Sequence, residues 1–255
     1  MNDFITDKQS REMIAELAEI LPRALEWQVV APPDSPLGFP ADDVRRRRWD
    51  PVFTGGGIVG LLLTDPAAPP PSRTKDIDLV LEIASYAEFV GMDGLLRKAG
   101  FTQSWIDNMP VVAWQWKGVR VDFLPHRPME LMQSNRWFPF LMDESERVEV
   151  MNGKFAWRAS APCFVATKFE AFYNRGKGDF LLSKDIEDIV AVIDGRVEML
   201  NEINVSSHDV RDFVSQSCRQ LLADKRFMEC LPQIVIDDQR EAVVEDRLRK
   251  LSMAT

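Results

Sequence analysis

The sequence has few cysteines and histidines, no long apolar run and a deficit of positive charge. There are three cysteines and two histidines in 255 residues. Cys163, Cys218 and Cys230 are odd in number and widely spaced, which fits buried thiols in a reducing compartment better than disulfides or zinc ligands. No run of about eighteen apolar residues is present, and the first residues lack the order of a signal peptide. We therefore expect a cytoplasmic protein without a membrane partner.

The charge balance argues against broad, non-specific binding of nucleic acid. The formal net charge is −9 and the sequence pI is about 4.9, whereas such binding depends on neutralising phosphates with lysine and arginine. The densest positive run is Arg45–Arg48, bounded by acidic residues. We interpret it as a solvated or internally paired surface in preference to an RNA contact.

The sequence contains enough apolar residues to form a core. Their pattern predicts strands and helices in the first part of the chain and helices alone in the second part. Apolar residues make up 45% of the chain. Two pairs of alternating segments flank Lys117-Gly118 and Asn152-Gly153, which predicts two β-hairpins. We predict an α/β (α+β) fold, with a mixed-sheet core over residues 1–160 and a mostly helical region over 161–255. Helices are expected at residues 7–27, with Pro22 as a kink or break, and at 85–99, 161–174, 184–194, 207–224 and 239–251.

The most informative stretch covers residues 52–83. Thr54-Gly55-Gly56-Gly57 follows a short strand-like segment and precedes an apolar run, so it predicts a strand-to-helix turn with exposed backbone amides. The N–H groups of such amides donate hydrogen bonds to phosphate oxygens. The lysine of a P-loop is missing after these glycines, and the short helix followed by a proline-rich loop does not fit a dinucleotide-binding unit.

Three aspartates follow this turn. Asp76 and Asp78 alternate along the start of a strand, so their side chains project to the same side. Asp122 lies on a later strand, residues 119–124, where it shares a face with Arg120. Because neighbouring carboxylates repel unless a cation lies between them, the pattern predicts Mg²⁺ or Mn²⁺.

The order of these motifs resembles the polymerase-beta-like nucleotidyltransferases. In that superfamily a glycine-rich turn, an Asp-x-Asp pair and a third Asp bind two metal ions and the triphosphate of an NTP. A second block resembles the abortive-infection, type IV toxin (AbiEii-like) branch. Its members carry a helical lysine, an Arg-Gly-Lys-like turn and a basic-Asp pair that opens the next helix, and the matching positions here are Lys168, Arg175-Gly176-Lys177 and Lys184-Asp185. The insertion at 179–183 leaves open whether Asp185 or Asp188 is the counterpart acid.

The resemblance implies an enzyme that moves an NMP from an NTP, such as ATP, to an acceptor hydroxyl. The acceptor implied for the toxin branch is the 3′ end of a tRNA, with a protein as another candidate, and a cognate antitoxin would be a partner. The implied catalytic residues are Asp76, Asp78, Asp122, Lys168 and Asp185, with the three aspartates Asp76, Asp78 and Asp122 as metal ligands. The implied nucleotide-binding residues are Thr54, Gly55, Gly56, Gly57, Arg73 and Arg175.

Other interpretations of the same residues remain open. The chain can be a non-catalytic module that binds nucleotide or metal, or an enzyme that modifies a small molecule. Lys168 stands among apolar residues and can extend from a buried helix without touching phosphate. Asp185 and Asp188 can serve as acids near a helix N-terminus. The completeness of the aspartate trio favours the enzyme.

Overall fold

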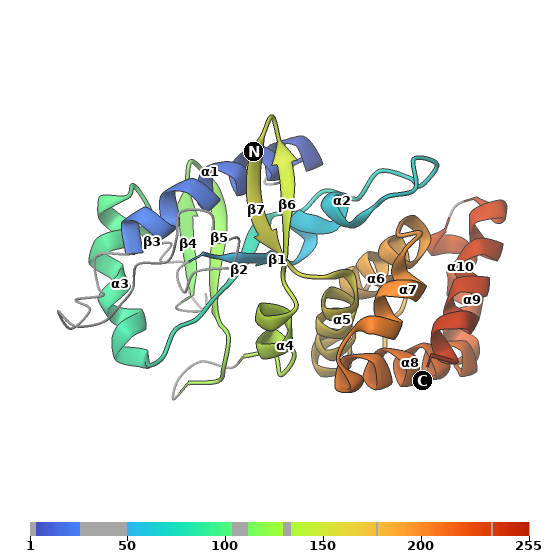
Figure 1. Ribbon diagram of the computed structural model, residues 1–255. Coiled ribbons are helices and arrows are strands. Elements are labelled where there is room, and N and C mark those ends of the chain that lie inside the picture. The colour runs from blue at the N-terminus through green and yellow to red at the C-terminus, as the bar shows by residue number, and fades with distance from the viewer. Residues whose placement is uncertain are drawn as a thin grey trace.

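The computed structural model describes residues 4–25, 50–103, 112–129, 134–176, 178–235 and 237–254. Strands and helices share the first part of the chain, and helices alone form the part after Ser160, as Figure 1 shows. This arrangement confirms the predicted mixed-sheet core followed by a mostly helical part. The buried apolar side chains form one continuous cluster that includes residues of both parts. The division into two domains at residue 160 stays a prediction.

The sheet has seven strands in the order β3-β4-β5-β2-β1-β7-β6, and it mixes both strand directions. β2 lies in the middle, antiparallel to β1 on one side and parallel to β5 on the other. β1 also pairs in parallel with β7. The strands are β1 (Val52–Thr54), β2 (Asp76–Leu81), β3 (Thr102–Gln103), β4 (Ala113–Trp116), β5 (Val119–Pro125), β6 (Glu146–Met151) and β7 (Lys154–Arg158).

Both predicted hairpins are present. Lys117 and Gly118 join β4 to β5, and Asn152 and Gly153 join β6 to β7. All four residues have positive φ angles, between 49° and 80°, as two-residue turns that follow the twist of a hairpin require. The β4–β5 hairpin matters for the site, because it holds the strand that carries Asp122 against the rest of the sheet.

Two long helices pack on the sheet region. α1 (Asp7–Leu25) contacts β6, β7 and α3, while α3 (Tyr86–Lys98) begins at the cap residue Ser85 and stops before Gly100. The glycine stop was predicted. A break at Pro22 was also predicted and is wrong: the helix runs through Pro22 to Leu25. Leu21, Pro22 and Leu25 are buried against the core, and this packing outweighs one lost backbone hydrogen bond.

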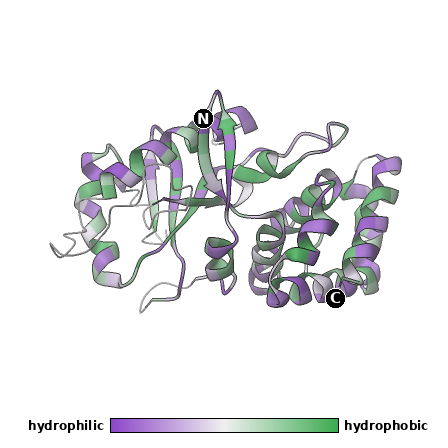
Figure 2. Ribbon diagram, viewed as in Figure 1, coloured by the Kyte–Doolittle hydropathy of each residue, from purple (hydrophilic) through white to green (hydrophobic). Residues whose placement is uncertain are grey.

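The C-terminal part is built from helices. The helix that begins at Ala161 is buried on all sides as far as Phe169, whereas the helix that begins at His208 buries one face. Figure 2 shows hydrophobic and hydrophilic residues alternating along these helices, as expected when one face is buried. α9 was not predicted, and Pro232 inside it obscured the helical pattern. The helices are α5 (Ala161–Arg175), α6 (Lys184–Gly195), α7 (Met199–Val205), α8 (His208–Ala223), α9 (Lys225–Ile234) and α10 (Asp238–Ser252). Short helical turns elsewhere are η2 (Gly56–Ile58), α2 (Val59–Leu62) and α4 (Phe138–Asp143).

The proline-rich segment between α2 and β2 is attached to the helical part. The backbone amides of Thr64 and Asp65 both donate hydrogen bonds to the Gly195 carbonyl at the end of α6. The Lys184 ammonium, at the start of α6, donates to the Ser72 hydroxyl. This segment therefore connects the two parts of the chain directly beside the first residues of β2.

Candidate active site

Three carboxylates converge where β2 lies next to β5. Asp76 and Asp78 flank Ile77, which is almost fully buried, so the two carboxylates point away from the core on the opposite face. β5 runs parallel to β2 in a register that places Asp122 directly beside Asp78. Residues paired in this way are about 5 Å apart and point to the same side. The structure thus brings Asp76, Asp78 and Asp122 together.

The three carboxyl groups are buried or partly buried and lie close to one another, and this raises the pKa of two of them. Burial, and then the charges of Asp76 and Asp122, raise the pKa of Asp78 to about 8. Burial also raises the pKa of Asp122, even though Arg120 opposes this change. A cation placed among the three carboxylates would relieve their repulsion.

The glycine turn lies directly against this acidic cluster. Thr54, the last residue of β1, is in register with Asp78, and the chain then turns through Gly55 into η2 and α2, as the sequence predicted. Gly55 has φ 69° and ψ −170°, a conformation that side chains disfavour. A Cβ at Gly55 would lie 1.8 Å from the Asp78 Oδ2 atom. The turn therefore lies so close to Asp78 that no side chain larger than that of glycine fits at position 55.

A second cluster of charges lies on α5 and α6. The Lys168 Nζ atom is 2.6 Å from Asp188 Oδ2 and 3.5 Å from Asp185 Oδ1. Arg175, at the end of α5, donates two hydrogen bonds of 2.8 and 2.9 Å to Asp185. Both acids of α6 thus hold Lys168, and the geometry leaves open which is the functional one. Lys184 adds a further ion pair to Asp188, at 3.3 Å.

The pKa shifts show that Lys168 and Asp185 keep their charges. Burial would lower the pKa of Lys168, but Asp188 and Asp185 outweigh it, so the pKa is raised and the ammonium is retained. Burial would raise the pKa of Asp185, but Arg175 and Lys168 outweigh that effect and lower it. Buried charges of this kind are stable only while each keeps its partner.

The two clusters border on the same glycine turn. A Cβ at Gly56 would lie 3.0 Å from Thr74 Oγ1 and 3.8 Å from Asp188 Oδ2. Asp78 and Lys168 also shift each other's pKa through their charges. Residues from β1, β2, β5, α5 and α6 therefore meet around the turn.

The remaining predicted nucleotide contacts lie at the edge of this group. Arg175 is largely exposed beyond its pairing with Asp185, with 70% of its side-chain area accessible. Arg73 is exposed and lies three residues before Asp76 in the chain. Its neighbour Thr74 is buried and donates a 3.1 Å hydrogen bond to Asp76 Oδ1.

Three residues that shape the site were not predicted to do so: Ser72, Thr74 and Arg120. Alternation along β5 placed Arg120 on the same face as Asp122, and this was the one available signal for it. In the structure Arg120 donates to both oxygens of the Asp122 carboxylate, one of them at 2.7 Å. The contact between Ser72 and Lys184 depends on how distant segments pack, which no local pattern indicates.

The donor chemistry of the trio fits a hard divalent cation, with one qualification. Three carboxylates on one face are the oxygen ligands that Mg²⁺ and Mn²⁺ prefer. Within the described part of the chain, however, no group of three or more acidic, histidine or cysteine side chains is already arranged as a metal site. Arg120 donates one hydrogen bond to each oxygen of Asp122. A cation held by all three carboxylates would therefore share the Asp122 oxygens with Arg120 or displace it.

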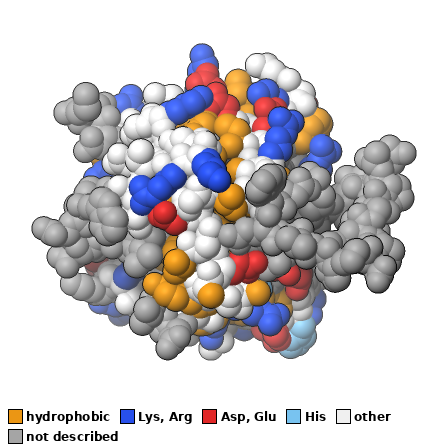
Figure 3. Space-filling view, turned by 90° about the vertical axis from the view of Figure 1, so that its left-hand side faces the viewer, with side chains coloured by type: hydrophobic (Ala, Val, Ile, Leu, Met, Phe, Trp, Pro, Cys, Tyr) orange, Lys and Arg blue, Asp and Glu red, His pale blue; other side chains and the backbone are white. Residues whose placement is uncertain are grey.

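The remaining predictions from the sequence concern the cysteines, membrane-spanning helices and clusters of basic residues. Cys163, Cys218 and Cys230 are free thiols; the first two are buried, and burial raises the pKa of Cys218 to about 12. No helix among the described residues is long and apolar enough to cross a membrane. Arg45–Arg48 and Lys177 lie outside the described residues. On the face seen in Figure 3, basic side chains are interspersed with acidic and apolar ones.

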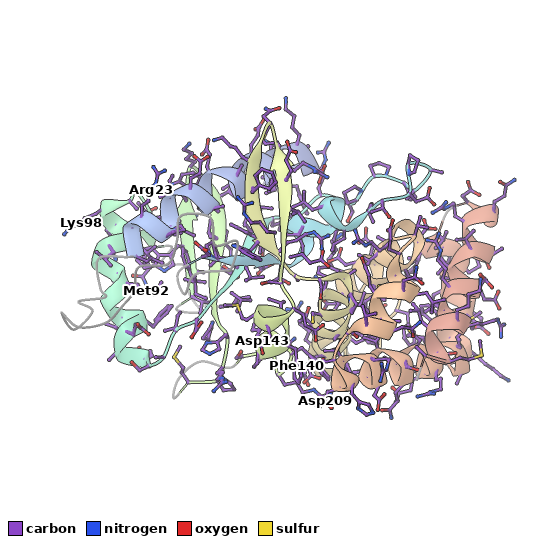
Figure 4. The ribbon with its side chains drawn as sticks, in the orientation of Figure 1. Arg23, Met92, Lys98, Phe140, Asp143 and Asp209 are labelled. Atoms are coloured by element: carbon purple, nitrogen blue, oxygen red, sulfur yellow. The ribbon has the colours of Figure 1, made fainter. Side chains whose placement is uncertain are left out.

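Two hollows of the described surface are lined by residues outside these clusters. One, of about 490 Å³, lies between α7 and α10 and is lined by residues such as Met199 and Arg247. The other, of about 480 Å³, lies between α1 and α3. Figure 4 labels two of its residues, Arg23 and Lys98, at the end of the molecule farthest from the C-terminal helices.

Comparison with solved structures finds the same architecture in another protein. The chain is similar to an antigenic nucleotidyltransferase-like protein from Paracoccidioides brasiliensis, with a TM-score of 0.50 and 16% sequence identity. The match covers 97% of this chain and 95% of that chain. No protein-family model and no curated protein matches the sequence. The chain therefore shares its fold with that protein over nearly its whole length.

Proposed function

We propose that the protein is a metal-dependent nucleotidyltransferase that moves an NMP from an NTP to an acceptor hydroxyl and releases pyrophosphate. The observation that carries the proposal is the convergence of three carboxylates from two adjacent strands on a glycine turn. The nucleotidyltransferase-like fold supports it. Because a fold alone does not define an activity, the residues of the site carry more weight than the likeness.

The carboxylates Asp76, Asp78 and Asp122 would hold Mg²⁺ or Mn²⁺. When bound, such ions lower the pKa of an attacking hydroxyl and stabilise charge on the transferring phosphorus and the leaving group. Asp122, on the separate strand, would accept the proton of the acceptor hydroxyl. Asp76 is held for its role by the hydrogen bond from Thr74.

The triphosphate would lie along the glycine turn. The backbone amides of Gly56 and Gly57 would donate to phosphate oxygens, and the Thr54 hydroxyl at the strand end would assist. Lys168 borders the turn through its partner Asp188 and would contribute positive charge. The exposed Arg73 and the exposed part of Arg175 would meet a bound phosphate from outside.

For the acceptor we propose the 3′ end of a tRNA, with a protein hydroxyl as the alternative, and for the cellular role a toxin controlled by an antitoxin protein. These proposals rest on the resemblance of the Lys168, Arg175 and Lys184-Asp185 block to the AbiEii-like branch. The packing of this block against the glycine turn supports them.

A second function is favoured by one observation. Because Arg120 engages both oxygens of Asp122, the structure as it stands suits a module that binds nucleotide or metal without transferring anything. The complete set of three aspartates favours the enzyme, since a module without catalysis has no need for all three.

Transfer of label from α-³²P-NTPs separates these functions. The protein is incubated with each NTP and Mg²⁺ or Mn²⁺, and with total tRNA, cell protein or small alcohols, while pyrophosphate is measured in parallel. We expect label in one acceptor class with matching pyrophosphate release. Asp76→Asn and Asp78→Asn should abolish both, whereas Asp143→Asn, which changes an exposed acid on α4, should not. Label in no acceptor, with no pyrophosphate, would favour the binding module.

A further inference from the structure

Arg120 is bound to Asp122 in the geometry of a strong, specific pair. The two residues are separated by one position on β5 and share a face. The Arg120 Nε and Nη2 atoms each donate to a different oxygen of the carboxylate. Such two-point contacts fix the orientation of a carboxylate as well as its charge. Asp122 is nearly inaccessible, with 9% of its side-chain area exposed, whereas Arg120 keeps 29%.

The same guanidinium stands among all three carboxylates of the site. In the parallel register Arg120 is paired with Asp76, and Asp122 is paired with Asp78. One guanidinium therefore lies among three carboxyl groups on two neighbouring strands. Arg120 supplies part of the neutralisation that a divalent cation would supply in the same place.

The cation and the guanidinium compete for the same oxygens. A metal ion that bridges Asp78 and Asp122 needs an oxygen of Asp122 directed toward Asp78, but both oxygens now accept hydrogen bonds from Arg120. Arg120 is partly exposed, so its side chain has room to withdraw.

We propose that Arg120 is a built-in counter-cation that holds Asp122 until a divalent cation displaces it. Arg120 is then a positioning residue that acts through Asp122 and lowers the affinity of the site for metal. This inference rests on the metal-binding part of the proposed function. It goes further in assigning control of metal affinity to a residue outside the ligand set.

Mn²⁺ binding, measured by EPR and by calorimetry, tests the proposal without any need for catalysis. The variants are Arg120→Gln, Arg120→Lys and the matched control Arg97→Gln. Arg97 also binds an acid, Asp93, through two hydrogen bonds, but it lies on α3, so its loss changes net charge equally away from the site. We expect Arg120→Gln to bind Mn²⁺ about tenfold more tightly than wild type. Arg120→Lys should fall between them, because lysine keeps the charge but not the two-point contact.

Asp122→Asn shows whether the effect passes through the proposed partner. The double variant Arg120→Gln/Asp122→Asn should bind Mn²⁺ no more tightly than Asp122→Asn alone. Persistence of the gain would mean that Arg120 acts only through its general field, and this would overturn the proposal. The proposal is equally overturned if Arg120→Gln binds Mn²⁺ no more tightly than Arg97→Gln, or not at all.

Thermal melting keeps the test usable if Arg120→Gln is less stable. Without metal, removal of Arg120 leaves the buried Asp122 carboxylate without its partner and should lower Tm. Because ligands stabilise the state that binds them, Mn²⁺ should raise Tm more in Arg120→Gln than in wild type. An equal or smaller rise would contradict the proposal. Metal binding that behaves as expected, without any NMP transfer, would count against the proposed activity and leave the role of Arg120 intact.

Discussion

Replacing Gly55 by alanine perturbs the closest contact in the site. The backbone of Gly55, at φ 69° and ψ −170°, lies in a region that is essentially reserved for glycine and that costs other residues about 1–3 kcal/mol. The new Cβ would also lie 1.8 Å from Asp78 Oδ2, so the carboxylate must move. Such overpacking typically costs about another 1–3 kcal/mol. We expect Gly55→Ala to lower the free energy of unfolding by about 2–6 kcal/mol.

Gly153→Ala is the matched control. Gly153 also has a positive φ, 74°, but a Cβ there would meet no heavy atom within 4 Å. Its cost should be that of the left-handed conformation alone, about 1–2 kcal/mol. The difference between the two variants in denaturant unfolding therefore reports the contact with Asp78.

The functional consequence of Gly55→Ala should exceed its effect on stability. Moving a residue that orients a metal ligand usually reduces metal affinity about 10- to 100-fold, and we expect the same loss for Mn²⁺ here. Gly153→Ala should bind Mn²⁺ as wild type does. Equal destabilisation of the two variants, together with full Mn²⁺ affinity in Gly55→Ala, would refute the role given to Gly55.

Three further predictions concern buried charges. Lys168→Met should lower the free energy of unfolding by up to about 3–5 kcal/mol, because it leaves buried Asp188 with only its longer ion pair to Lys184, and adding Asp188→Asn should restore part of this loss. Folding raises the pKa of Asp78 from 3.8 to about 8, so the folded state binds more protons than the unfolded state between these pH values. The metal-free protein should therefore lose stability as pH rises through that window. In thermal melts with EDTA, Asp78→Asn should remove this part of the pH dependence. Arg240→Met should destabilise the protein by about 3 kcal/mol in urea by leaving Asp194 buried and unpaired, yet Mn²⁺ affinity should not change.

Local patterns in the sequence predicted the parts of the site that lie within single elements. Alternation along β2 gave the shared face of Asp76 and Asp78, and the glycines gave the turn after β1. The two-residue turn signals gave both hairpins, including the one that carries Asp122. In each case the controlling interactions join residues close together in the chain, so a short window of sequence contains the information.

Contacts between distant segments were beyond such reasoning. The parallel register that sets Asp122 beside Asp78 depends on how β5 pairs with β2. The pairing of Lys184 with Ser72 depends on how the proline-rich segment reaches α6. At Pro22 a local rule failed, because burial of the helix end outweighed the missing amide. The grouping of Lys168 with Asp185 was inferred only through resemblance to a family.

A crystal grown with Mn²⁺ and a non-hydrolysable NTP analogue tests the central claim most directly. The anomalous signal of manganese should lie within ligand distance of Asp76, Asp78 and Asp122, with the phosphates of the analogue along the glycine turn and Asp122 released from Arg120. Manganese bound elsewhere, or Asp122 still paired with Arg120 while a fully occupied nucleotide lies in the site, would contradict it.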